Sequence, residues 1–202
     1  MTPKARILAA AFFAAICFLF ASSVAQAGPL SIVNVGAPAI NCIFNVTCTV
    51  VVTDTPGAFT PPGDAGTGNL QSRTFPPSVP PAPAAGNMAY VYRVDLTSVK
   101  GLTAVNCVTR LQVNFGPVTK LPYVKGALFD VFVVTSGGLG SVGLASAVQV
   151  GSVITFTFSA PVCPGATSYF FGLASKITVP KPGKARLFFS LGGTAIVPAR
   201  NP

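Results

Sequence analysis

Hydrophobic and polar residues alternate along three segments of the chain, with the period of two that a half-buried β-strand produces. In the first segment, the side chains of one face are all apolar: Tyr90, Tyr92, Val94 and Leu96. The opposite face of this segment includes Arg93 and Asp95. Residues 107–115 and 153–159 repeat the pattern. These segments predict antiparallel strands that bury one face in a hydrophobic core.

Five further segments are less regular but rich in apolar residues. They lie at 30–35, 42–53, 127–135, 168–178 and 185–197. Turn signals such as Gly116-Pro117 and Gly192-Gly193 punctuate the chain. No long segment shows the 3.6-residue period of an amphipathic helix. The sequence therefore predicts an all-β fold, an antiparallel β-sandwich or jelly roll of about eight or nine strands.

Residues 55–87 interrupt this pattern. The segment contains eight prolines and five glycines, and Pro76-Pro77, Pro80-Pro81 and Pro83 lie close together. Proline fixes the backbone and lacks the amide hydrogen that a strand ladder needs. We therefore expect a long Pro/Gly-rich loop at 55–87. Loops of this length within a domain are often functional or disordered.

The N-terminus has the three parts of an export signal. Lys4 and Arg6 give it a positive start, and an apolar run extends from Ile7 to Phe20. The small residues that follow end in Ala25-Gln26-Ala27, which predicts cleavage after Ala27. The alternative is an uncleaved membrane anchor, but the run is shorter than the roughly 20 apolar residues that a span needs.

We therefore expect a signal peptide at residues 1–27 and a single β-sandwich domain at 28–202, which includes the Pro/Gly-rich loop. The remaining length suits one ordinary domain with a hydrophobic core. The export signal predicts a secreted protein of the periplasm or the extracellular space. After cleavage, we do not expect an integral membrane protein.

Four cysteines follow the expected cleavage site: Cys42, Cys48, Cys107 and Cys163. An even number in an exported chain predicts disulfides, because that compartment is oxidising. Three pairings are possible, and we favour Cys42 with Cys48 and Cys107 with Cys163. A straight strand would hold the first pair about 20 Å apart, and a disulfide needs Cα atoms within about 7 Å, so this pair requires a turn. The alternation suggests that the second pair joins two packed sheets.

Charge is sparse and predominantly positive. Removing Lys4 and Arg6 from the 13 basic residues leaves 11 against four acidic ones, a net charge of +7. A positive excess favours contact with anionic polymers or membrane surfaces, although it also keeps an apolar surface soluble. Most of the charges are scattered. The exception is a loose cluster near the C-terminus: Lys176, Lys181, Lys184 and Arg186.

Familiar catalytic groups are scarce. The chain contains no histidine, so the usual serine triad has no candidate. Glycoside hydrolysis usually needs two facing carboxylates. Of the four aspartates, Asp54 and Asp64 lie in turn-like contexts, and Asp95 is two residues from Arg93 on the same strand face, where it more simply balances charge. The cysteine spacing also lacks the pairs typical of a zinc site. We therefore expect no enzyme activity, no cofactor and no metal ion. Asp130 is the one suggestive acid, because it lies within an apolar segment. It is either a general acid or, as we favour, a structural residue that faces outward or pairs with an arginine.

Adjacent aromatic residues offer another kind of contact. Tyr169, Phe170 and Phe171 follow one another, as do Phe188 and Phe189. On a strand, neighbouring side chains point to opposite faces, so one ring of each group is a candidate for exposure. Exposed rings can stack on sugars or anchor a partner. Tyr169 and Phe171 are therefore candidate contacts, unless the second face is also covered.

These features favour a secreted, non-catalytic structural or interaction protein of the cell envelope or extracellular matrix, which associates with itself or with a matrix polymer. A module that binds a glycan or an anionic polymer through the basic cluster and the exposed rings is the alternative. An enzyme with an unusual site around Asp130 is a second alternative. Nucleic acid is not an expected partner, because the basic residues are not grouped with aromatic platforms.

Overall fold

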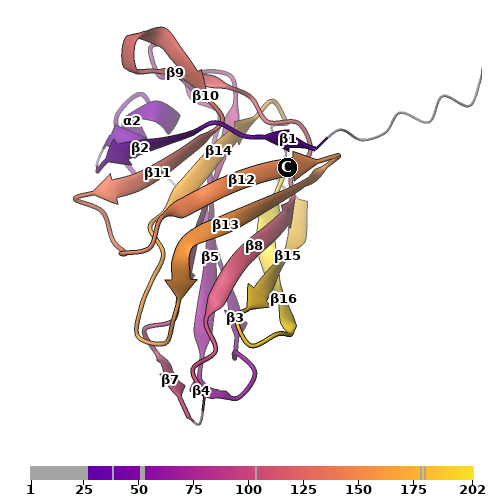
Figure 1. Ribbon diagram of the computed structural model, residues 1–202. Helices are drawn as coiled ribbons and strands as arrows, with labels where there is room; N and C mark the ends of the chain where they lie inside the picture. The colour runs from indigo at the N-terminus through magenta and orange to yellow at the C-terminus, as the bar shows by residue number, and fades with distance from the viewer. Residues whose placement is uncertain (1–26, 38, 51–52, 103, 178, 180) are drawn as a thin grey trace, which may run out of the picture.

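Two six-stranded β-sheets pack face to face in the computed structural model, which describes residues 27–202 except 38, 51–52, 103, 178 and 180 (Figure 1). The fold is all-β and sandwich-like, as the alternation predicts. The described residues form sixteen strands, which is more than the eight or nine expected. The signal peptide expected at 1–27 lies outside the described residues, apart from Ala27.

We call the two large sheets A and B. Sheet A contains, in spatial order, β1 (Gly28–Pro29), β12 (Leu144–Val150), β13 (Val153–Val162), β8 (Val108–Asn114), β15 (Lys181–Phe189) and β16 (Thr194–Asn201). Sheet B contains β2 (Ile32–Gly36), β11 (Val131–Ser136), β14 (Phe171–Ser175), β6 (Met88–Asp95), β5 (Gly68–Phe75) and β3 (Thr53–Phe59). Neighbours within each sheet are antiparallel, except that β2 runs parallel to β11.

Two short antiparallel pairs complete the strands. One consists of β9 (Leu121–Tyr123) and β10 (Ala127–Phe129), joined by the 3₁₀ turn η2 (Val124–Gly126). The other consists of β4 (Asp64–Gly66) and β7 (Val99–Gly101). The two pairs lie at opposite ends of the sandwich (Figure 1).

The inner faces of the sheets form the main core. The apolar face predicted for 90–96 is entirely within it, because Tyr90, Tyr92, Val94 and Leu96 are fully buried. The Tyr92 ring packs against Phe156 of sheet A and Phe171 of sheet B. Its hydroxyl donates a hydrogen bond of 2.8 Å to the carbonyl of Arg200. This bond ties the middle of sheet B to the edge strand of sheet A.

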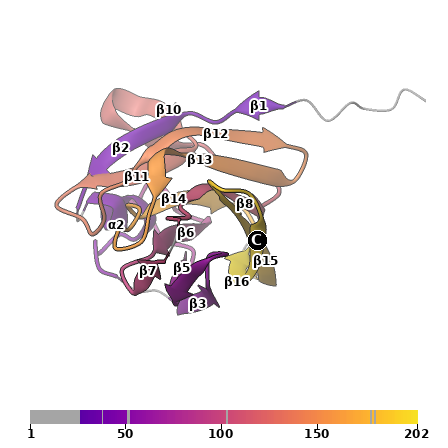
Figure 2. The same ribbon diagram turned by 60° about the horizontal axis from the view of Figure 1, so that its bottom comes forward.

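The outer face of sheet B carries a second apolar cluster. The short helix α2 (Ala39–Phe44) places Phe44 against Phe75 and Phe132 of the sheet. Val91, on the outward face of β6, is also buried. Figure 2 shows α2 beside β11 and β14, away from β15 and β16. Sheet B is therefore covered on both faces along these central strands.

Two predictions from the N-terminal half are wrong. The segment 42–53 was expected as a strand, but it begins in α2 and turns back at the first disulfide. The region 55–87 was expected as one long loop, but residues up to 75 include β3, β4 and β5. Pro56 is compatible with β3 because this strand is at the edge of sheet B.

Other strand boundaries also differ from those expected. The segment 127–135 divides into β10 and β11 at Asp130, whose backbone N–H bonds to Ser31 instead of continuing a ladder. The segment 185–197 divides into β15 and β16 around Gly192-Gly193. The alternation expected at 107–115 is confirmed from Arg110 onward, because Leu111, Val113 and Phe115 are buried and the residues between them are not. It fails at Val108, which is also buried, where the register on both sides of β8 shifts.

The disulfides pair Cys42 with Cys48 and Cys107 with Cys163, as favoured from the spacing. The first has a Cα–Cα distance of 4.1 Å, which the turn after α2 allows. The second does not join the two sheets, contrary to expectation. It links the ends of neighbouring strands of sheet A, because Val108 of β8 pairs with Val162 of β13. Two disulfides indicate an oxidising, extracytoplasmic environment.

We predict that the second disulfide contributes more to stability than the first. It closes a loop with a sequence separation of 56 residues, against 6 for the first. The chain-entropy relation gives about 4 and about 2 kcal/mol for loops of these lengths. Denaturant unfolding of the Cys107→Ser/Cys163→Ser and Cys42→Ser/Cys48→Ser variants measures both. Equal losses, or a larger loss for the first pair, would contradict the prediction.

We also predict a loss of stability in alkaline solution. Burial raises the pKa of Tyr90 to about 12. The pKa of Tyr92 is also raised, mainly by burial and to a smaller extent by the nearby Tyr90. The folded protein therefore holds these protons more tightly than the unfolded chain, whose tyrosines ionise near pH 10. The free energy of unfolding should fall as the pH rises above about 10. Unfolding titrations of Tyr92→Phe should show a smaller alkaline decline, whereas an unchanged decline would assign it to other groups.

Candidate functional site

The two sheets differ sharply in charge. The strands of sheet B contain two arginines and two aspartates, so their formal charges cancel. The strands of sheet A contain five basic residues and no acidic one: Arg110, Lys181, Lys184, Arg186 and Arg200. Lysine and arginine are spread along the sequence, but the fold concentrates unpaired positive charge on one of the two sheets.

The charges of sheet B are paired within the sheet. Arg73 contacts Asp54 at 2.7 Å, and Arg93 contacts Asp95 at 2.8 Å. Both guanidinium groups also lie over the ring of Phe170, at 4.4 and 5.3 Å from its centre. Phe170 is thus held by cation–π contacts that belong to the structure of this face.

The outward face of sheet A carries the basic residues on its central strands. In β15, alternation buries Ala185 and Leu187 in the core and leaves Lys184 and Arg186 exposed. Arg110, on the adjacent strand β8, is also exposed. Among the described residues, none of these three cations forms a salt bridge.

Cross-strand register places polar residues beside Arg186. Arg186 lies opposite Gln112 of β8, which in turn lies opposite Thr155 of β13. The Gln112 side chain donates a hydrogen bond of 3.2 Å to the Thr155 hydroxyl. On its other side, Arg186 lies opposite Ile196 of the edge strand β16. The row therefore contains a hydroxyl, an amide and a guanidinium across three adjacent strands, followed by an apolar side chain.

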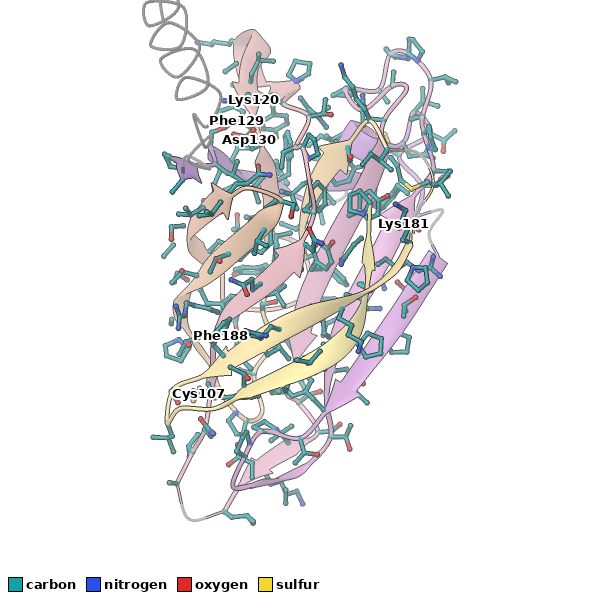
Figure 3. All side chains as sticks on the ribbon, turned by 90° about the vertical axis from the view of Figure 1, so that its right-hand side faces the viewer. Cys107, Lys120, Phe129, Asp130, Lys181 and Phe188 are labelled. Carbon is teal, nitrogen blue, oxygen red and sulfur yellow. A yellow bond between two sulfur atoms is a disulfide. The ribbon has the colours of Figure 1, made fainter. Side chains whose placement is uncertain are left out.

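A second row lies beside the first. It places Thr157, Arg110 and Phe188 on adjacent strands. The Arg110 guanidinium lies 4.5 Å from the centre of the Phe188 ring, a cation–π contact. Phe188 is visible on the β15 ribbon, well away from the end that carries Lys120 (Figure 3). Because Arg110 covers part of this ring, Phe188 orients the arginine more than it offers a bare stacking surface.

The face is hollowed around the first row. An open depression of about 250 Å³ is lined by residues from β8, β13, β15 and β16, which include Gln112, Asn114, Val153, Lys184, Arg186 and Ile196. Arginine can hold a carboxylate, sulfate or phosphate through two parallel hydrogen bonds, and lysine adds a point charge. The amides and hydroxyls can bind sugar hydroxyls. This arrangement suits an anionic group on a hydroxylated ligand.

The structure separates the residues proposed as ligand contacts. Lys184 and Arg186 lie on the outer face of sheet A, and Lys181 is exposed at the start of β15. Lys176 lies elsewhere, in a groove with residues 117–119. The basic cluster in the sequence is therefore not a single surface.

The aromatic residues proposed as ligand contacts are buried or partly buried. Phe171 is 1% exposed and belongs to the core between the sheets, so it is removed from the candidate contacts. Tyr169 is partly buried and packs against the same core. Two other rings from the same aromatic runs, Phe170 and Phe188, are covered by arginines. Phe170 also packs against the second apolar cluster, whereas Phe188 belongs to neither cluster. Sequence alone does not reveal that arginines stack on these two rings.

Asp130 is a clamp for the N-terminal strand. Its carboxylate Oδ2 accepts hydrogen bonds from the Ser31 N–H at 2.9 Å and the Ser31 hydroxyl at 2.7 Å. The Lys120 ammonium lies 3.6 Å from the same oxygen. Asp130 is 3% exposed, and its own N–H bonds back to Ser31. It therefore neither faces outward nor pairs with an arginine, as we had favoured, because its partners are a serine and a lysine.

We predict that Asp130→Asn destabilises the protein by about 1–3 kcal/mol, because it weakens a buried acceptor of several hydrogen bonds. Hydrogen exchange should also accelerate along β2, which the clamp holds next to β11. Asp54→Asn is the control, since its more exposed carboxylate pairs with Arg73 at the surface and should contribute less than about 1 kcal/mol. Equal effects of the two substitutions, with unchanged exchange in β2, would contradict the clamp.

Comparison with protein families, with curated proteins and with solved structures finds no match for this chain. No helix among the described residues is long and apolar enough to span a membrane. In the same residues, no three side chains of histidine, cysteine, aspartate or glutamate are grouped as a metal site would need. The case for function therefore depends on the geometry and charge of the surface.

Proposed function

We propose that this protein is a secreted, non-catalytic interaction protein of the cell envelope or extracellular matrix, and that it binds an anionic polymer through the outer face of sheet A. The observation that carries the proposal is the difference in charge between the sheets. Sheet B pairs its arginines with aspartates, whereas the strands of sheet A have five basic residues and no acid. An extended acidic glycan is the ligand class that best fits this face.

The shape of the face also favours a polymer. Three of its cations, Arg110, Lys184 and Arg186, lie on two adjacent strands, β8 and β15, and neighbouring strands are about 4.8 Å apart. Gln112 and Asn114 add amide groups between or beside the charges. An open, shallow row of this kind can contact successive units of a chain, each through modest, exposed interactions. We therefore expect weak binding per unit, with affinity that grows with polymer length.

The test is binding to immobilised heparin, a sulfated polysaccharide, with uncharged dextran as the neutral comparison. The protein should bind heparin and not dextran, and binding should weaken as salt screens the charges. Lys184→Gln/Arg186→Gln should weaken binding about tenfold, which corresponds to about 1.4 kcal/mol. Thermal unfolding checks that the variant remains folded.

The matched control is Lys100→Gln/Lys125→Gln, which removes the same net charge from other parts of the surface. Lys100 is in β7 and Lys125 is in η2, both outside sheet A. This variant should bind heparin nearly as well as the original protein. If the two double variants lose affinity equally, net charge and not the sheet A face is responsible. Absence of heparin binding at low salt would remove the proposal.

A further inference from the structure

The hairpin of β9 and β10 projects from one end of the sandwich, beyond the two large sheets (Figure 1). Leu121 and Phe129, at its base, are buried or half-buried against the protein. Toward the tip, the side chains turn outward. Val124 is 59% exposed and Leu128 is 55% exposed. Two branched apolar side chains are thus presented to solvent at a convex tip.

Two lysines flank these apolar residues. Lys120 precedes β9 and is exposed, and Lys125 lies at the tip within η2. Lys125 has φ = 58°, in the left-handed region that glycine adopts more readily. Lys125 is exposed, and so are its neighbours Val124 and Gly126.

The base of the hairpin adds a third lysine. Thr119 pairs with Ala174 through an isolated bridge, which brings the segment after β14 beside the hairpin. Here Lys176 and Ile177 are exposed, and they line a groove of about 410 Å³ with residues 117–119. Asp130, the acid at the foot of the hairpin, is buried in its contacts with Ser31 and Lys120. This end of the molecule therefore combines exposed apolar residues with positive charge.

We propose that the hairpin tip and the adjacent segment dock on an anionic lipid surface. Amphipathic elements bind such surfaces when apolar side chains enter the boundary between headgroups and acyl chains while lysines contact the anionic headgroups. A convex tip with few apolar residues suits shallow insertion, whereas a protein partner would usually meet a larger, flatter patch. Lys125 and Lys176, which form no salt bridge among the described residues, supply the complementarity that selects an anionic surface, whereas the charge of Lys120 is offset by Asp130.

This site is separate from the outer face of sheet A, so the two proposals can fail independently. In Figure 3, Lys120 and Phe129 lie at one end of the molecule, and Phe188 lies on the sheet, well away from them. The polymer face presents cations among amides and hydroxyls, whereas the hairpin presents cations among apolar side chains. Docking of the hairpin on a bilayer would leave the outer face of sheet A available.

The test is flotation of the purified protein with lipid vesicles. One vesicle preparation contains phosphatidylcholine alone, and the other contains equal parts of phosphatidylcholine and phosphatidylglycerol. The protein should float with the anionic vesicles and remain behind with the neutral ones. Lys125→Gln/Lys176→Gln should weaken binding by about fivefold per lysine. Val124→Ser/Leu128→Ser should weaken it by about tenfold at unchanged net charge.

Two control variants separate this surface from general effects. Leu102→Ser/Leu191→Ser removes exposed apolar side chains elsewhere, and Lys100→Gln removes an exposed lysine from β7, at the opposite end of the sandwich. Both should float as the original protein does. Failure to float with anionic vesicles would overturn the proposal, and so would equal losses in the hairpin and control variants. Equal flotation with neutral vesicles would overturn the role assigned to the lysines.

Discussion

The burial of aromatic side chains between the two sheets is the constraint on which the rest of the molecule depends. Tyr92, Phe156 and Phe171 contact one another in this layer, and the Tyr92 hydroxyl fastens sheet B to β16. Because the inner faces of both sheets are apolar and buried, the two sheets differ mainly in the polarity of their outer faces. The outer face of sheet B is apolar, like its inner face, and it is covered by α2 and the segments around it. Sheet A has only one apolar face.

This difference explains why the function is sought on sheet A. A strand that is apolar on both faces needs a second layer of cover, which α2 supplies by placing Phe44 in the same cluster as Val91. A strand with a polar outer face, such as β15, remains stable when that face is open. The same alternation that buries Leu187 exposes Arg186. Stability therefore depends on the inner face of this strand and the proposed binding on its outer face, so substitutions at Arg186 should leave the core intact.

The sequence predicts the parts of the fold that depend on local pattern. The period of two correctly assigns Tyr90, Tyr92 and their neighbours to the core. It fails where distant contacts decide the outcome. The break at Asp130 is caused by Ser31, a residue 99 positions away. The helix α2 was mistaken for a strand because a short apolar run does not distinguish the two structures, although the favoured disulfide already required a turn nearby.

The candidate site could be predicted only in part for the same reason. Lys184 and Arg186 were identified from their clustering in the sequence, and Arg110 and Gln112 fall on the polar side of their own predicted strand. These residues lie side by side only because β15 pairs with β8, and the two strands are far apart in the chain. Conversely, Lys176 is close to Lys181 in sequence, yet it lies in the groove beside residues 117–119. Proximity in sequence was therefore a poor guide to a shared surface.

The most direct test of the central claim is to map the contact by NMR, using isotope-labelled protein and a short sulfated oligosaccharide. The account predicts that amide signals shift in a contiguous group on β8, β13 and β15, strongest near Gln112 and Arg186, while those of sheet B remain in place. Shifts confined to sheet B, or no shifts at low salt and high ligand concentration, would contradict it.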